Sequence, residues 1–164
     1  MRYFEKISFE QFKKDIADDI NLYESYNIPC RSTKTSAGYD FMVLNDFEIL
    51  PGEIKKIPSG IKVKMNDDEY LGLYIRSSLG FKYNIRLTNQ VGIIDSDYYN
   101  NENNEGHIWC SIQNEGEKPV SFKKKDRLFQ GIFSKFLIVS NEQEVKNTRK
   151  SGIGSTNKES ENNG

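Results

Sequence analysis

The sequence predicts an all-β protein of the sandwich, jelly-roll or barrel type, preceded by one short helix. Short runs alternate apolar with polar residues, as in 61–65, where every second side chain is apolar. Turn signals such as Pro51-Gly52 and Asn114-Glu115-Gly116 separate these runs. No βαβ repeat occurs in the 164 residues, a length that suits one domain. Many short strands with regular turns are typical of these folds.

The helix is expected over Ser8–Ile20. Its apolar residues recur at helical spacing, at Phe9, Phe12, Ile16 and Ile20. Ser8 is a suitable N-cap, and Gln11 follows three residues later, as in a capping box. This is the only helix that the pattern predicts.

The strands are expected after Pro29. The candidates are Glu53–Ile57, Ile61–Met65, Leu71–Ile75, the apolar run Val91–Ile94, His107–Ile112, Val120–Phe122 and Leu128–Ile138. Two polar stretches are expected to be unstructured: Asn100–Glu105, and the tail from Asn141 onward. We therefore divide the chain into an N-terminal extension (1–28), a β-domain (29–140) and a mobile C-terminal arm (141–164).

Composition narrows the function. The formal net charge is −1, which argues against bulk nucleic-acid binding because that requires a basic excess. The N-terminus has no apolar run that could act as a signal peptide or membrane span. Cys30 and Cys110 form neither a metal-spacing motif nor a disulfide framework. We expect two structural thiols in a reducing cytoplasm.

The tail contains the glycine- and hydroxyl-rich segment Arg149–Thr156. Glycines allow the backbone to wrap an anion, while Ser155, Thr156 and Arg149 add donors suited to phosphate. A P-loop is excluded because Gly154 stands where that motif requires lysine, and no room for a following domain remains. Taken alone, the segment is either a phosphate-binding arm or a flexible linker.

Two further motifs end predicted strands. Arg76-Ser77-Ser78-Leu79-Gly80 suits an oxyanion, although a solvated turn is the alternative. The stretch Asn89–Tyr98 runs from apolar residues into Asp95, Asp97 and Tyr98. Paired acids can bind a metal, activate water or cap a turn, and the residues alone leave these roles open.

The order of five motifs is more informative than any one of them. Ala37-Gly38-Tyr39-Asp40-Phe41, Arg76–Gly80, Gly92-Ile93-Ile94-Asp95-Ser96-Asp97-Tyr98, Arg127-Leu128-Phe129-Gln130 and Arg149–Thr156 closely resemble the five ordered motifs of the trimeric dUTPase family. The resemblance spans Ala37 to Thr156. The N-terminal helix and the insertion at 100–105 resemble a bacterial or phage variant.

The resemblance implies a jelly-roll-like β-barrel (β-clip) that forms a homotrimer with active sites at subunit contacts. It implies hydrolysis of dUTP to dUMP and pyrophosphate, which limits uracil incorporation into DNA and supplies dUMP for dTMP synthesis. Asp95 would be the general base that activates water for attack on the α-phosphorus. The implied substrate-binding residues are Arg76, Ser77, Ser78, Asn89, Gly92, Ile93, Ile94, Tyr98, Gly106, Trp109, Gln130, Arg149, Ile153, Gly154, Ser155 and Thr156.

Within that set, Tyr98 would lie against the deoxyribose. Asn89 and Gly92–Asp95, with a return strand near Gly106–Trp109, would form a hairpin that binds uracil through main-chain atoms. Mg²⁺ would be held mainly by phosphates and water, while Asp40 either supports it in the outer shell or holds its own loop. Arg127 is expected to be structural. The single histidine, His107, is expected to have a surface or packing role.

The chain departs from the family pattern at Ile153, where an aromatic residue usually stacks on uracil. Two alternatives remain. One is a dCTP deaminase, which shares the fold. The other is a regulatory protein that binds a protein partner and is switched by nucleotide occupancy, a role that a phage-derived member could have. Asp95 and Tyr98 in the third motif favour dUTP hydrolysis over deamination.

Overall fold

The computed structural model describes residues 1–144. Its strands are β1 (Tyr3–Lys6), β2 (Cys30–Arg31), β3 (Tyr39–Met42), β4 (Phe47–Ile49), β5 (Ile54–Pro58), β6 (Ile61–Lys64), β7 (Glu69–Ile75), β8 (Ile85–Leu87), β9 (Gly92–Asp95), β10 (Trp109–Asn114), β11 (Val120–Phe122) and β12 (Arg127–Lys135). Its helices are α1 (Phe9–Asp15), α2 (Ile20–Ser25), α3 (Ser77–Tyr83) and the 3₁₀ turn η1 (Ser96–Tyr98). The all-β fold with an N-terminal helix is confirmed.

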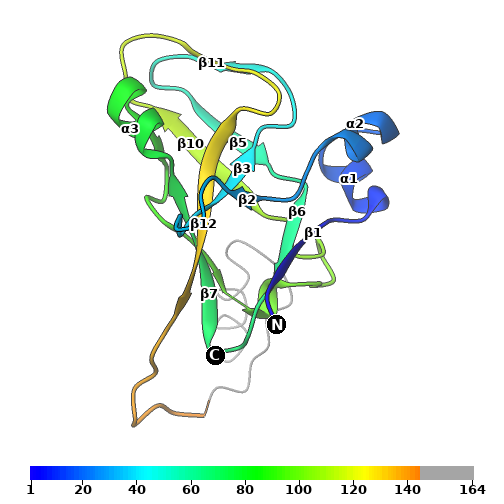
Figure 1. Ribbon diagram of the computed structural model, residues 1–164, viewed down its shortest axis with the longest axis vertical. Helices are drawn as coiled ribbons and strands as arrows, with labels where there is room; N and C mark the ends of the chain where they lie inside the picture. Colours follow the sequence, from blue (N-terminus) through cyan, green and yellow to red (C-terminus); the bar gives the residue numbers. More distant parts are fainter. Residues whose placement is uncertain (145–164) are drawn as a thin grey trace, which may run out of the picture.

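The strands form antiparallel sheets that enclose one core. The largest sheet has the order β2-β3-β12-β7-β9, and a second has the order β5-β10-β8. The pairs β1-β6 and β11-β4 complete the described β-structure. The core contains the stacked rings of Phe41 and Phe129, whose centroids are 4.5 Å apart, and it also includes the buried Leu71 and Ile112. Figure 1 shows α1 and α2 on one side of the β-structure and α3 on the other.

The expectation of a single helix over Ser8–Ile20 was wrong in two respects. Ser8 does cap α1, since its Oγ accepts a hydrogen bond from the Gln11 amide. However, α1 ends at Asp15, and a new helix starts at Ile20 because Asp19 accepts a hydrogen bond from the Leu22 amide. A second N-cap residue, Asp19, lies inside the apolar pattern and therefore divides the segment.

A further helix, α3, occupies the segment from Ser77, where we considered a solvated turn. Asn84 ends this helix in the left-handed conformation (φ 55°), and its amide contacts the Gly80 and Leu79 carbonyls. The last strand is also shorter than predicted, because β12 ends at Lys135 while Leu137 beyond it is 97% exposed. No described helix is both long enough and apolar enough to cross a membrane.

Candidate functional site

A cavity of about 710 Å³ opens beside β9 and β10. Predicted site residues that line it are Asn89, Gly92, Ile93, Ile94, Asp95, Tyr98 and Trp109. A second cavity of about 550 Å³, lined by β1 and the end of β12, contains none of the predicted site residues. The structure therefore gathers the third-motif residues around the first cavity.

The predicted hairpin of Gly92–Asp95 with a return strand near Gly106–Trp109 does not form within residues 1–144, because β9 pairs with β7 whereas β10 pairs with β5 and β8. The segment between β8 and β9 instead forms one wall of the cavity. Its turn is closed by the Gln90 amide, which donates to the Leu87 carbonyl, and Gln90 has a positive φ of 63°. Gly92 is buried opposite Leu73, where an added Cβ would lie 3.1 Å from that side chain. Glycine thus lets β9 approach β7 closely. Ile93 remains 53% exposed and gives the wall an apolar surface.

Asp95 ends β9 and lines the cavity. It is the N-cap residue of η1, but its side chain makes no capping hydrogen bond. Capping that turn is therefore not what requires a carboxylate here. Tyr98, at the end of η1, donates from its hydroxyl to the His107 carbonyl at 3.0 Å, which fixes the phenol beside the cavity.

The asparagine loop, which we define as residues 100–105, is more ordered than the sequence suggested. We expected a polar loop with nothing to bury, yet Asn101 is only 8% exposed. Its Nδ2 donates to the Tyr98 carbonyl at 2.8 Å, and its Oδ1 accepts from the amides of Asn103 and Asn104. Backbone hydrogen bonds also close the loop, such as that from the Asn100 amide to the Glu105 carbonyl at 3.0 Å, and the asparagine side chains add to them.

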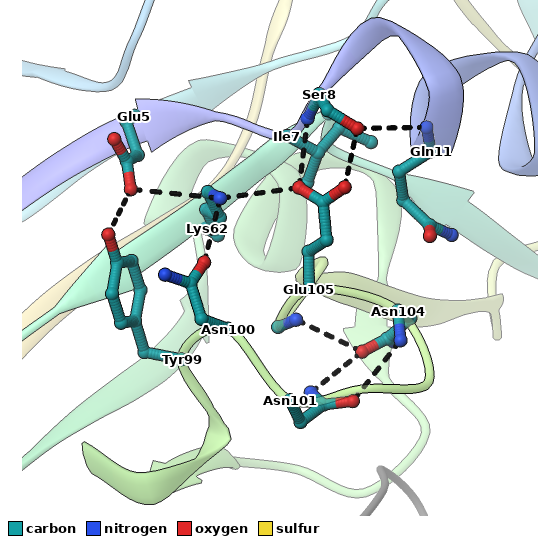
Figure 2. A network of polar contacts seen from close by, with 12 residues as sticks. Glu5, Ile7, Ser8, Gln11, Lys62, Tyr99, Asn100, Asn101, Asn104 and Glu105 are labelled. Carbon is teal, nitrogen blue, oxygen red and sulfur yellow. Dashed lines mark hydrogen bonds and ion pairs between the residues drawn. The ribbon is translucent and has the colours of Figure 1, made fainter.

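The sequence analysis did not identify Asn103 and Asn104 as cavity residues, although both line it. The only available signal was the local excess of asparagine, which also describes disordered segments. Figure 2 shows how the loop is attached to the rest of the chain: Glu105 accepts hydrogen bonds from Ser8 and from Lys62. Burial raises the pKa of Glu105, but the hydrogen bonds from Ser8 and Lys62 outweigh it and hold the pKa below its usual value.

His107 has the expected packing role. It is fully buried, and its Nε2 accepts a hydrogen bond from the Gly60 amide at 2.9 Å. The proton of the neutral ring must then be on Nδ1, which lies 2.6 Å from Asp15 Oδ2. Burial lowers the pKa of His107, with Asp15 opposing the shift. The ring therefore connects α1 to the strand that carries Trp109.

The second-motif residues lie elsewhere. Arg76 precedes α3, its Nε lies 3.2 Å from Asp40 Oδ1, and Ser77 and Ser78 form the first turn of that helix. Arg127 contacts the same carboxylate at 3.4 Å. Asp40, which lies within β3, thus joins the arginine before α3 to the first residue of β12.

Gln130 belongs to this second group through β12, where it pairs with Asp40 of β3. Its side chain lies against Gly38, and a Cβ added there would be 2.1 Å from Gln130 Oε1. The glycine of the first motif is thus required to make room for the glutamine of the fourth. The sequence alone gave no reason to connect these two positions.

The two groups lie at opposite ends of β7. Asp95 pairs with Tyr70 near the start of that strand, and Arg76 follows its last residue, Ile75. At a rise of roughly 3.3 Å per residue, the six steps from Tyr70 to Arg76 span about 20 Å. One chain therefore does not bring Asp95 and Arg76 together.

The remaining predicted residues lie outside the described part of the chain: Arg149, Ile153, Gly154, Ser155 and Thr156. Within residues 1–144, no three His, Cys, Asp or Glu side chains are grouped closely enough to hold a metal ion. A magnesium ion would suit this site only if the phosphates of a ligand and water supplied most of its coordination.

Comparisons with known proteins agree on one family. The dUTPase family model matches residues 24–158. The deoxyuridine 5'-triphosphate nucleotidohydrolase of Lactococcus lactis is 45% identical over 131 residues, covering 79% of this chain and 87% of that protein. The Actinobacillus succinogenes protein of the same name is 37% identical, covering 70% of this chain and 74% of that protein. The Streptococcus mutans dUTPase structure superposes with a TM-score of 0.68 at 40% identity, covering 84% of this chain and 98% of that one. The chain belongs to the dUTPase family.

Proposed function

We propose that this chain hydrolyses dUTP to dUMP and pyrophosphate. The observation that supports this most directly is the cavity that combines the turn between β8 and β9 with Asp95, Tyr98 and the single tryptophan, Trp109. Family membership and 45% identity to a deoxyuridine 5'-triphosphate nucleotidohydrolase support the same activity. The enzyme would limit uracil incorporation into DNA and provide dUMP for dTMP synthesis.

In this proposal Asp95 is the general base. It accepts a proton from water, whose oxygen forms a bond to the α-phosphorus in line with the bridging oxygen. The bond from the α-phosphorus to that bridging oxygen breaks, and pyrophosphate leaves with the electron pair. A carboxylate at the end of β9, at the edge of the cavity, is suitably placed to meet a water beside a bound nucleotide.

The base would be selected by main-chain groups of β9 and of the turn that precedes it. Uracil presents an imide edge, whereas cytosine presents an amino group, and a mismatched polar edge leaves buried groups unpaired. Asn89 and the backbone from Gly92 onward line the cavity and could read that edge. Tyr98 would lie against the deoxyribose.

The phosphates would be bound by Arg76, Ser77, Ser78 and Gln130 of a neighbouring subunit. The separation of about 20 Å along β7 between Asp95 and Arg76 of one chain supports this arrangement. A closed ring of identical chains solves this, and a homotrimer is the assembly we propose. Mg²⁺ bound to the triphosphate would neutralise its charge, with Asp40 acting on Arg76 rather than on the metal.

The C-terminal arm would close over the bound nucleotide. Its candidate groups are Arg149, Gly154, Ser155 and Thr156 at the phosphates, with Ile153 covering the base. Isoleucine supplies apolar cover without ring stacking, a difference of about 1 kcal/mol. Truncation before Thr148 is expected to leave a folded assembly with severely reduced hydrolysis.

The test is pyrophosphate release from dUTP, dCTP, dTTP and UTP with Mg²⁺, together with ammonia release from dCTP. We expect dUTP to be the preferred substrate and no ammonia, whereas ammonia release would indicate a deaminase. Asp95→Asn should still bind dUTP but lose roughly 100-fold or more in kcat, as removal of a general base does. Unchanged turnover of that variant would refute the role of Asp95.

Two further assignments belong to this proposal. The cytoplasm is the proposed compartment, since two free cysteines, one of them exposed, suit a reducing environment. A regulatory protein partner stays a prediction, which a pull-down from host extract with and without dUTP would test.

A further inference from the structure

The asparagine loop meets the cavity at Asn104. Asn104 Nδ2 donates to Tyr98 Oη at 2.8 Å, and Tyr98 Oη donates to the His107 carbonyl at 3.0 Å. A phenol hydroxyl has one proton to donate and can accept from another donor. The hydroxyl of Tyr98 is therefore held from both sides, once as donor and once as acceptor.

The orientation of the Asn104 amide is determined by its other contacts. Its Oδ1 accepts from Asn101 Nδ2 at 2.9 Å and from the Gly106 amide at 3.1 Å. Because both partners are donors, the atom that faces them must be the oxygen, so Nδ2 must face Tyr98. The hydrogen bond to Tyr98 is thus a consequence of how the loop closes.

The loop is in turn fixed to the N-terminal ribbon of β1 and β6. Glu105 accepts from the Ser8 amide at 3.0 Å and lies 3.2 Å from Lys62 Nζ. Lys62 also donates to Asn100 Oδ1 at 2.8 Å, and the Tyr99 hydroxyl donates to Glu5 (Figure 2). These contacts hold both ends of the loop, so Asn104 cannot easily follow a displaced Tyr98.

We propose that Asn104 is a positioning residue for sugar selection: it immobilises Tyr98 so that the cavity accepts 2′-deoxyribose and rejects ribose. The inference rests on the proposed function, in which Tyr98 contacts the sugar. A ribose adds one hydroxyl, which a ring free to move aside would tolerate. A ring whose hydroxyl is bound by both Asn104 and the His107 carbonyl excludes that hydroxyl by shape.

The experiment compares kcat/KM for dUTP and UTP in the full chain and in five variants, four single and one double. Asn104→Ala is expected to lower the dUTP-to-UTP ratio roughly five- to tenfold, the factor that one hydrogen bond corresponds to. The change in the ratio should arise mainly from a lower KM for UTP. Glu102→Gln, an exposed position in the same loop, is the matched control and should keep the ratio within roughly twofold.

A double-mutant cycle tests whether Asn104 acts through the Tyr98 hydroxyl. Tyr98→Phe should lower the ratio by itself, and adding Asn104→Ala should then change little more. Asn104→Asp keeps the Oδ1 acceptor that closes the loop but turns the donor to Tyr98 into an acceptor. The single proton of the Tyr98 hydroxyl can then serve only the new carboxylate or the His107 carbonyl, so the hydroxyl loses one of its two contacts and the ratio should also fall, a test that remains if Asn104→Ala folds poorly. An unchanged ratio in both Asn104 variants, or full additivity with Tyr98→Phe, would overturn the inference.

Binding provides a measurement that does not depend on hydrolysis. Trp109 is the only tryptophan and lines the cavity, so its fluorescence should report dUMP and UMP binding. Asn104→Ala should narrow the difference between the two affinities, and an unaltered difference would contradict the inference. Absence of dUTP hydrolysis in the unaltered protein would refute the proposed function. The ratio of the dUMP and UMP affinities, measured by Trp109 fluorescence, would still test the role of Asn104.

Discussion

Replacing Asp40 by asparagine is expected to destabilise the protein without changing its metal requirement. The Asp40 carboxylate is only 7% exposed and is shared by Arg76 Nε at 3.2 Å and Arg127 Nη1 at 3.4 Å. It also accepts from Ser32 Oγ at 2.6 Å. Asparagine keeps one acceptor and removes the charge, so two guanidinium groups lose their common anion.

The magnitude follows from the burial of the partners. Breaking a buried ion pair by removing one member costs about 3–5 kcal/mol. Here the Arg76 and Arg127 side chains are 31% and 42% exposed, so water compensates for part of the loss. We expect the free energy of unfolding to fall by about 2 kcal/mol.

Urea unfolding at fixed protein concentration measures this change, and Asp68→Asn is the matched control. Asp68 pairs with Lys135 at 2.6 Å, but the two side chains are 53% and 70% exposed. Its loss should therefore cost less than about 1 kcal/mol. A Mg²⁺ titration of activity should give the same half-saturation for Asp40→Asn as for the unaltered enzyme. Unchanged stability combined with a raised Mg²⁺ requirement would refute the reasoning and assign Asp40 to the metal's outer shell.

Three further predictions concern single positions. Gly106 has φ 82°, and a Cβ added there would lie 2.6 Å from a main-chain oxygen, whereas Gly52 has φ 77° and open space around it. Gly106→Ala should therefore lower the free energy of unfolding by at least about 2 kcal/mol more than Gly52→Ala does. Equal urea midpoints for the two variants would contradict this. Burial lowers the pKa of His107, the only histidine, in the folded chain. The unfolded chain therefore binds a proton on this ring at a higher pH than the folded chain does, so the free energy of unfolding should fall as the pH drops below about 6.5. Melting temperature between pH 8 and 5 measures this loss, and His107→Gln should flatten the curve; the same slope in both would exclude His107 as its origin. A thiol reagent should modify exposed Cys30 in the folded protein and spare Cys110, whose pKa burial raises; two fast-reacting thiols would be inconsistent with the fold.

The sequence was most informative where a local rule acts alone. The alternation of apolar residues predicted β6 and β7, and the Ser8 cap predicted the start of α1. Apolar spacing misplaced the end of α1, because it does not reveal that Asp19 caps a second helix. The α3 helix was missed for a similar reason, since Ser77 and Gly80 have modest helix propensity.

Contacts between distant segments could not be predicted from one sequence. The fit of Gln130 against Gly38 and the sharing of Asp40 by two arginines depend on strand register within the large sheet. The asparagine loop illustrates the same limit, because its composition matches disordered segments while its order depends on bonds to Ser8 and Lys62.

The length of β7 has a consequence for mixtures of damaged subunits. A chain that lacks the Asp95 carboxylate keeps an intact Arg76 end, and a chain that lacks Arg76 keeps an intact Asp95 end. If each reaction centre takes one end from each of two neighbours, random co-assembly of these two inactive proteins restores about one quarter of the centres. Hydrolysis would then reappear when the two inactive variants are unfolded and refolded together. A monomeric enzyme cannot show this form of complementation.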